Sequence, residues 1–144
     1  MAASSPDRAT GPFDLGSTPI HLGNEPDAEN PAVPLPDFGF DPASFEGYIA
    51  AHCKPGAPGR LFMVEVTPAD WASWECHTEG DELVIVLEGK GEFIQEIEGA
   101  ERRMRVEPGV AVINPRGVWH TADVEEPIRA IYVTPCPGTQ HRER

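Results

Sequence analysis

Two carboxylates and a histidine lie close together in the stretch ECHTEGDE, which runs from Glu75 to Glu82. Glu75 and His77 are two residues apart, so in a β-strand their side chains point to the same face. Glu82 follows across a short turn, and residues beside a hairpin turn lie near each other. Two buried carboxylates are costly without a compensating charge, whereas a divalent ion would make both of them, and a neutral imidazole, into ligands. The pattern therefore predicts that Glu75, His77 and Glu82 converge on a divalent metal.

A fourth candidate ligand, His120, ends the distant segment NPRGVWH. A predicted strand from 110 to 114 and a turn at 115–117 precede it, because Pro and Gly are typical turn residues. Such a position suits a site built inside a barrel from two separate hairpins. We therefore expect His120 to complete the group.

Short β-rich segments surround these residues and must position them. Each segment is bounded by Gly, Pro or acidic turn residues, and a regular spacing of such segments is typical of a β-sandwich or barrel. The predicted strands cover 60–67, 70–77, 82–89, 90–97, 102–108, 110–115, 118–124 and 128–135. The segment ELVIVLEG is apolar at nearly every position, so both of its faces should be covered. One face would line the barrel, and a second subunit or the N-terminal arm would cover the other.

The segments on either side of the predicted barrel, which covers residues 60–137, differ from it in composition. Residues 1–41 are rich in Pro and acidic residues and are expected to form an extended or partly disordered arm. Residues 42–59 should form a short helix and a linker, since Asp41 can cap a helix that starts at Pro42 and runs to His52. Residues 138–144 form a polar tail, for which disorder is the default expectation. The alternation of Val33, Leu35, Phe38 and Phe40 indicates an extended segment lying over apolar surface.

The overall charge restricts the partners. With a net charge of −13 and a pI near 4.6, the chain is a poor candidate for binding nucleic acid or an anionic membrane. Neither a signal peptide nor a membrane-spanning run is expected. The three cysteines, Cys53, Cys76 and Cys136, are odd in number and form no CxxC pair, which indicates reduced thiols in a cytoplasmic protein.

At these residues the sequence resembles the cupins, whose two motifs read G(X)5HXH(X)3–4E(X)6G and G(X)5PXG(X)2H(X)3N. His77, Glu82 and Gly89 are in register with the first motif, but Ala69 and Glu75 replace its leading Gly and His. The second motif is matched at its Gly, Pro, Gly and His, which here are Gly109, Pro115, Gly117 and His120. Val124 replaces its final Asn. The resemblance covers about residues 61–134.

The resemblance implies an all-β fold, a cupin-type jelly-roll β-barrel that is often dimeric and holds one metal. The family's ligand positions carry over to His77, Glu82 and His120, and Glu75 carries over by position only. Glu75 could bind metal, act as a general base, or point to solvent at the barrel mouth. This donor set suits one divalent transition metal, Mn, Fe, Zn or Ni, and the added carboxylate favours Mn, Fe or Zn.

The functional expectation is a metal-binding cupin acting on a small molecule, as an oxygenase, isomerase or lyase. The alternative is a non-catalytic, metal-dependent module that binds or senses a small ligand. A third interpretation is a barrel whose site has decayed, which the departures at Glu75 and Val124 keep open. A homodimer is expected to form through the outward face of residues 83–87.

Overall fold

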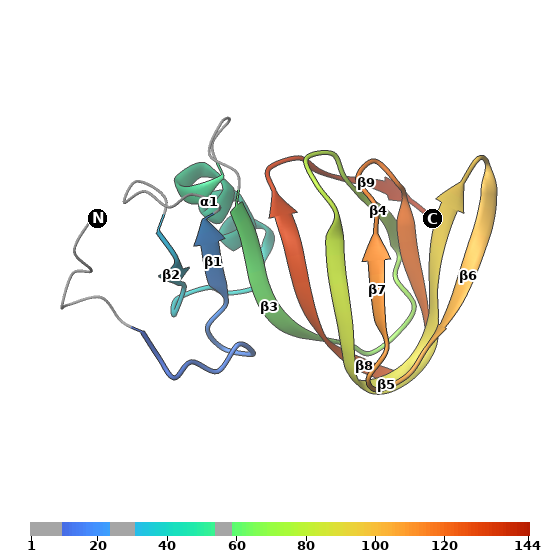
Figure 1. The fold of residues 1–144 in the computed structure, drawn as a ribbon, viewed down its shortest axis with the longest axis horizontal. Helices are drawn as coiled ribbons and strands as arrows, with labels where there is room; N and C mark the ends of the chain where they lie inside the picture. Colours follow the sequence, from blue (N-terminus) through green and yellow to red (C-terminus); the bar gives the residue numbers. More distant parts are fainter. Residues whose placement is uncertain (1–9, 24–30, 54–58) are drawn as a thin grey trace.

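The computed structural model describes residues 10–23, 31–53 and 59–144. Figure 1 shows curved strands that surround a common interior, with a small lobe of one helix and two short strands at one end. The elements are β1 (Ile20–Gly23), β2 (Val33–Pro34), α1 (Pro42–His52), β3 (Gly59–Thr67), β4 (Ser73–His77), β5 (Glu82–Ile97), β6 (Ala100–Val106), β7 (Ala111–Asn114), β8 (His120–Cys136) and β9 (Thr139–Glu143).

All the strand pairs are antiparallel. The main order is β2-β1-β3-β8-β4-β9, and β5 pairs with β8, β7 and β6. The sheet does not close on itself, but the curved antiparallel arrangement is jelly-roll-like, so the predicted all-β fold is confirmed.

Two long strands run where the sequence predicted four short ones. Strand β5 continues past Gly89 and β8 continues past Val124, so the strand ends expected at these two residues are wrong. Gly89 has a φ of +89°, and a Cβ there would come within 2.0 Å of the carbonyl oxygen of Pro127. The register between β5 and β8 shifts at the same place. Glycine therefore bends a continuous strand here instead of ending it.

The described parts of the N-terminal arm belong to the fold. Strand β1 pairs with β3, and β2 pairs with β1. Leu35, Phe38 and Phe40 pack against the core, as the sequence predicted. Residues 1–9 and 24–30 of the expected arm, and 54–58 of the expected linker, lie outside the described residues.

Helix α1 has the predicted bounds. Asp41 caps it by accepting a hydrogen bond of 2.7 Å from the backbone N–H of Ser44, and Pro42 occupies the first turn. In the part of the chain that the structure describes, no helix has the length and apolar character needed to cross a membrane.

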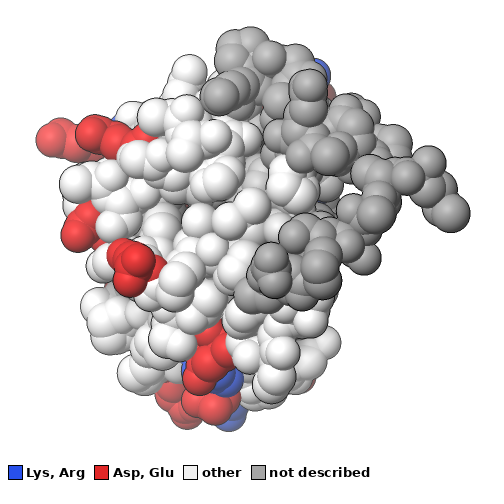
Figure 2. All heavy atoms as spheres, turned by 90° about the vertical axis from the view of Figure 1, so that its left-hand side faces the viewer, with Lys and Arg blue, Asp and Glu red and all other residues white. Residues whose placement is uncertain are grey.

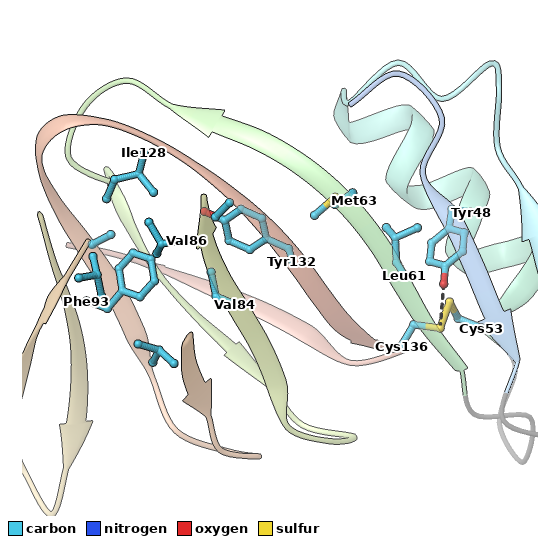
Figure 3. Packing of buried hydrophobic residues seen from close by; sticks show 14 residues of the cluster. Tyr48, Cys53, Leu61, Met63, Val84, Val86, Phe93, Ile128, Tyr132 and Cys136 are labelled. Carbon is cyan, nitrogen blue, oxygen red and sulfur yellow. Dashed lines mark hydrogen bonds between the residues drawn. A yellow bond between two sulfur atoms is a disulfide. The ribbon is translucent and has the colours of Figure 1, made fainter. Parts of the chain in front are cut away.

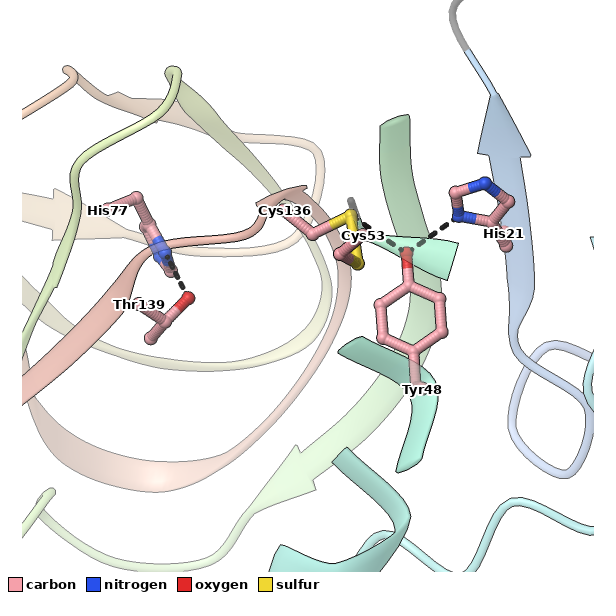
Figure 4. The surroundings of a disulfide bond; sticks show 6 residues. All are labelled: His21, Tyr48, Cys53, His77, Cys136 and Thr139. Carbon is pink, nitrogen blue, oxygen red and sulfur yellow. Dashed lines mark hydrogen bonds between the residues drawn. A yellow bond between two sulfur atoms is a disulfide. The ribbon is translucent and has the colours of Figure 1, made fainter. Parts of the chain in front are cut away.

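A disulfide joins Cys53, at the C-terminal end of α1, to Cys136, at the end of β8. The expectation of three reduced cysteines is therefore wrong, and Cys76 is the free one. Disulfides are typical of oxidising compartments, so this bond removes the support that reduced thiols gave to a cytoplasmic location. Figure 4 shows how the bond fastens the helix lobe beside the segment that leads into β9.

The buried residues beside this disulfide include a polar pair. The Nδ1 atom of His21 lies 2.8 Å from the hydroxyl of Tyr48, and the ring of His52 stacks on that of His21. The sequence pattern offers neither His21 nor His52 a partner, which predicts solvent exposure, but His21 is fully buried. Because Tyr48 also packs in the hydrophobic core, these contacts join the helix lobe to the barrel.

The hydrophobic core is continuous from the barrel to this lobe. In Figure 3, Val84, Val86, Phe93 and Ile128 lie together between the strands, and Leu61 and Met63 extend the cluster towards Tyr48. Glu82 lies at the start of the strand that carries Val84 and Val86, so its carboxylate is held at the edge of a packed core.

The C-terminal residues form a strand, contrary to the disordered tail that we expected. Strand β9 pairs with β4 over five residues, and Glu75 and His141 lie directly opposite each other. The segment's polar composition concealed this pairing, because β9 is an edge strand and most of its side chains face solvent.

Surface charge follows the acidic composition. Figure 2 views the molecule from the side of β1, β2 and α1, where Asp and Glu side chains lie at the left and lower parts of a broad uncharged area. Lys and Arg side chains are few on this view.

Candidate metal centre

Three strands bring the four predicted residues together. Strand β4 supplies Glu75 and His77 from one face, β5 supplies Glu82 at its first residue, and β8 supplies His120 at its first residue. His120 pairs directly with Glu75 across the β4–β8 ladder. One ligand atom from each of the four residues lies within 4.8 Å of all the others. The convergence inferred from strand alternation and the hairpin is thus present.

The separations between these atoms are those of ligands around one ion. His77 Nε2 lies 3.0 Å from Glu75 Oε1 and 3.1 Å from Glu82 Oε2. His120 Nε2 lies 3.6 Å from Glu75 Oε1 and 3.4 Å from Glu82 Oε1. Ligands with bonds of about 2.1 Å are separated by about 3.0 Å at right angles and about 3.4 Å in a tetrahedron. A transition metal would therefore fit among these four side chains with little rearrangement.

Each of the two imidazoles points one buried ring nitrogen at this position, and that nitrogen forms no hydrogen bond. Among the described residues, the side-chain atoms that are buried without a hydrogen-bond partner are His77 Nε2 and His120 Nε2. Carboxylate oxygens are near both atoms, but none stands in hydrogen-bonding geometry. Since a buried polar atom without a hydrogen bond costs free energy, two such atoms facing one point and two carboxylates would be well satisfied by a shared metal ion.

The opposite ring nitrogens fix the orientation of the imidazoles. His120 Nδ1 lies 3.3 Å from the carbonyl oxygen of Val118, which can only accept, so Nδ1 carries the hydrogen. In the neutral ring, Nε2 then presents its lone pair to the site. His77 Nδ1 lies 3.0 Å from Thr139 Oγ1, which can accept in the same way. Outer partners of this kind are usual for metal-binding histidines.

Glu82 is held from two sides. Asn114 Nδ2 donates to Oε1 at 3.1 Å, and Thr134 Oγ1 donates to Oε2 at 2.8 Å. Gln95 in turn donates to Asn114 Oδ1 at 3.0 Å. Glu82 and His77 are each 1% exposed and His120 is 2% exposed, so these groups form a buried, pre-oriented set.

Burial and the attraction between the histidines and the carboxylates shift the pKa values of the site in opposite directions. Burial lowers the pKa of His77 and of His120, but the neighbouring carboxylates of Glu75 and Glu82 outweigh it and raise both to about 9. Burial raises the pKa of Glu82, and the two histidines more than offset this and lower it to about 2. Without metal, the cluster therefore compensates its two negative charges with protons on its imidazoles.

The side chain of Glu75 is the most exposed of the four at 21%, and one further residue contacts it. His141 Nε2 lies 2.9 Å from Glu75 Oε2. We assigned His141 to the tail and missed this contact. Its position could have indicated the contact, because residues two apart, such as Thr139 and His141, have side chains on the same face of a strand.

A cavity of about 770 Å³ opens onto Glu75, His77 and Glu82. Its wall is mixed: Leu61, Met63, Trp71 and Tyr132 are apolar or aromatic, and Glu65, Thr67 and Thr134 are polar. Strand alternation predicts Phe62 or Met63 in the lining, where Met63 is present, and it also predicts five others: Val84, Val86, Phe93, Met104 and Ile131. Those five are not among the residues that line it, and Val84, Val86 and Phe93 lie in the hydrophobic core instead. Residues from α1, including Phe45 and Ile49, cover one side of the cavity.

The family model for the cupin domain matches residues 62–134, which is just over half of the chain. The chain belongs to the cupin family. The match spans the strands that carry all four candidate ligands. No curated protein matches the sequence.

Several solved structures are similar to part of this chain at low sequence identity. Hydroquinone 1,2-dioxygenase from Sphingomonas sp. TTNP3 has 12% identity and a TM-score of 0.45, over 55% of this chain and 60% of that one. Oxalate decarboxylase from Bacillus subtilis has 14% identity and a TM-score of 0.46, over 60% of this chain and 23% of that one. A double-stranded β-helix protein from Klebsiella pneumoniae has 22% identity and a TM-score of 0.46, over 60% and 76%. The cupin chain thus spans less than two thirds of the aligned dioxygenase and under a quarter of the decarboxylase.

Proposed function

We propose that this cupin binds one divalent transition metal through Glu75, His77, Glu82 and His120. The observation that carries the proposal is the pair of buried Nε2 atoms that make no hydrogen bond and face two carboxylates across one point. Two nitrogen and two oxygen donors suit Mn, Fe, Zn or Ni and are a poor match for Cu(I), which prefers sulfur. A bound ion would supply Lewis acidity and open coordination positions to a small molecule.

The protein's own residues would bind and orient that molecule. The cavity places the aromatic rings of Trp71 and Tyr132 and the polar side chains of Glu65 and Thr67 around one space that reaches the candidate ligands. A mixed wall of this kind suits a small, partly apolar molecule. We propose an oxygenase, isomerase or lyase reaction, and the alternative is a binder or sensor without turnover.

Metal content tests the first step. Protein purified without added metal should contain close to one equivalent of Mn, Fe, Zn or Ni, measured by inductively coupled plasma mass spectrometry. His120→Ala should lose the metal while keeping its far-UV circular dichroism spectrum, because removing one ligand leaves the core intact. His52→Ala is a matched control, since it removes a histidine outside the site. Wild-type protein that neither contains nor takes up these metals would refute the proposal and favour a decayed site.

Turnover separates the enzyme from the binder. Oxygen uptake and product formation should be measured with small diols and keto acids on metal-loaded protein. Glu75→Gln then distinguishes the roles of Glu75: loss of metal indicates a ligand, whereas retained metal with lost turnover indicates a general base. Tight binding of a molecule from the panel without turnover would favour the binding module.

We also propose that a second copy of the chain covers the outer face of the sheet. Cross-strand neighbours form an apolar row there, in which Phe62 faces Val133, Val133 faces Leu83, and Leu83 faces Ile113. Ile113 is 60% exposed. Because the chain carries a charge of −13, two copies repel each other except through an uncharged face.

Sedimentation velocity tests the homodimer. Ile113→Glu should shift it to monomer, because the new charge would be buried in the contact. Ile97→Glu is the control, since Ile97 is exposed at the end of β5, outside this row. A wild-type chain that sediments as a compact monomer would contradict this part of the proposal.

A further inference from the structure

The two oxygens of Glu75 have different surroundings. Oε1 faces the candidate metal position, 3.0 Å from His77 Nε2, whereas Oε2 lies 2.9 Å from His141 Nε2 on the other side. Glu75 also stands where the cupin motif has a histidine. A carboxylate at this position has one more rotatable bond and one more donor atom than an imidazole, so its orientation needs an additional constraint.

Strand β9 supplies that constraint from alternate positions. Thr139 contacts His77 Nδ1 at 3.0 Å, and His141, two residues later, contacts Glu75. The ladder places each partner directly opposite its site residue, Thr139 facing His77 and His141 facing Glu75. One face of β9 is thus built against two of the four candidate ligands.

The other face of β9 keeps the strand in place. The guanidinium of Arg142 lies over the rings of Trp74, at 5.3 Å, and Trp119, at 4.7 Å, and it also pairs with Glu96. Cation–π contacts and an ion pair on one residue resist displacement of the strand. His141 can therefore be 58% exposed and still have a defined position beside Glu75.

We propose that His141 is a positioning residue of the metal centre: its Nε2–H donates to Glu75 Oε2 and restricts Glu75 to a single ligating oxygen, Oε1. This inference rests on the proposed metal-binding function. The Glu75–His141 pair takes the place of the motif histidine, with the carboxylate as ligand and the imidazole as its support. His141 also lines the cavity that reaches Glu75.

A variant series on the full chain tests the role. The dissociation constants of Zn²⁺ and Mn²⁺ are measured by chelator competition for wild type, His141→Ala, His141→Gln and Gln140→Ala. Loss of an outer partner weakens metal binding by about 10- to 100-fold, and this is the expected effect of His141→Ala. His141→Gln should recover most of the affinity, because its amide N–H can donate to the same oxygen. Gln140→Ala changes an exposed neighbour on the same strand and should match wild type.

Two further measurements separate positioning from general stabilisation. In a Glu75→Ala background, His141→Ala should have no additional effect on metal affinity, because His141 acts through Glu75. The visible spectrum of the Co²⁺-substituted protein should change in His141→Ala and return towards wild type in His141→Gln, whereas a lost surface contact would leave it unchanged.

The outcomes are distinct. His141→Ala with wild-type affinity and spectrum would overturn the positioning role while the metal centre stands. An additive loss in the double variant, or a failure of His141→Gln to recover, would overturn it in favour of direct ligation by the imidazole. Wild-type protein that binds neither ion would overturn the metal centre and this inference together.

Discussion

Metal binding should release protons, and the structure sets how many. In the metal-free protein the pKa values of His77 and His120 are about 9, since burial lowers them less than Glu75 and Glu82 raise them. Both side chains are therefore imidazolium ions at pH 7. Each must lose the proton on its ligating nitrogen before it can bind a metal. We expect about two protons to be released for each metal bound at pH 7.

The magnitude follows from the same pKa values. A pKa of 9 places each imidazole about two pH units from half-deprotonation at pH 7, which weakens binding about 100-fold per imidazole. The two together weaken the apparent affinity about 10⁴-fold at pH 7 relative to pH above 9. Between pH 6 and 8, the logarithm of the dissociation constant should fall by about 2 per pH unit.

Isothermal titration calorimetry measures this release directly. The heat of Zn²⁺ binding is recorded at pH 7 in buffers with different ionisation enthalpies, and its slope against that enthalpy gives the protons released. His52→Ala controls for histidine chemistry outside the site. A slope near zero, with affinity independent of pH, would show that the imidazoles are already neutral and would refute the reasoning.

The same shifts give the metal-free protein a stability plateau. The raised pKa values of His77 and His120 stabilise the fold fully below the unfolded value of 6.5, and this contribution is lost as pH rises through about 9. Glu82 has a folded pKa of about 2, so its contribution is complete above 4.5 and is lost as pH falls towards 2. Urea denaturation in EDTA should therefore find the site's largest contribution between pH 4.5 and 6.5, and Glu82→Gln should flatten the acid side.

Three other changes test the fold and the support of the site. Replacing Cys53 and Cys136 with Ser opens a link between residues 83 positions apart, which should cost up to about 4.5 kcal/mol of unfolding free energy. Wild type in a non-chelating reductant should approach the same urea midpoint, and equal midpoints with and without reductant would contradict the disulfide. Gly89→Ala forces a Cβ to 2.0 Å from a backbone oxygen and should cost about 3 kcal/mol, whereas Gly99→Ala, with positive φ but no atom nearby, should cost about 1 kcal/mol. Equal losses would remove the steric explanation of the bend in β5. Asn114→Ala removes a donor to Glu82 Oε1 and should weaken Zn²⁺ binding about 10-fold without changing far-UV circular dichroism, and wild-type affinity would show that Thr134 alone positions Glu82.

Local sequence patterns predicted the convergence of Glu75, His77 and Glu82 because these residues are only a few positions apart in the sequence. Glu75 and His77 share a face by strand alternation, and Glu82 returns across a tight turn. The N-cap at Asp41 and the start of α1 at Pro42 are likewise set by neighbours in the chain. His120 became a candidate from the predicted strand and turn that precede it, and the spacing shared with the cupin motifs supported the same position.

The missed features depend on contacts between distant segments. Cys53 and Cys136 are 83 residues apart, and their pairing follows from where α1 docks on β8. His21 is buried because Tyr48 of that same helix offers it a hydroxyl. Strand β9 has little apolar character, and its pairing with β4 is fixed by Arg142 between two tryptophans. In each case the residue types were compatible with solvent exposure, and only the packing of the helix lobe or the sheet edge decided otherwise.

The second carboxylate at the site also has a consequence for ligand charge. Two carboxylates and two neutral imidazoles would leave a divalent ion with no net charge, whereas a histidine at position 75 would leave one positive charge. Glu65 adds negative charge on the same cavity wall, and burial together with Glu75 and Glu82 raises its pKa. A neutral diol should therefore bind the metal-loaded protein more tightly than a carboxylate of the same size. Glu75→His should reverse that preference if it retains metal, because the centre would gain a positive charge. Calorimetry with matched diol and acid pairs measures both effects, and tighter binding of the acid by wild type would show that the wall's charge does not govern selection.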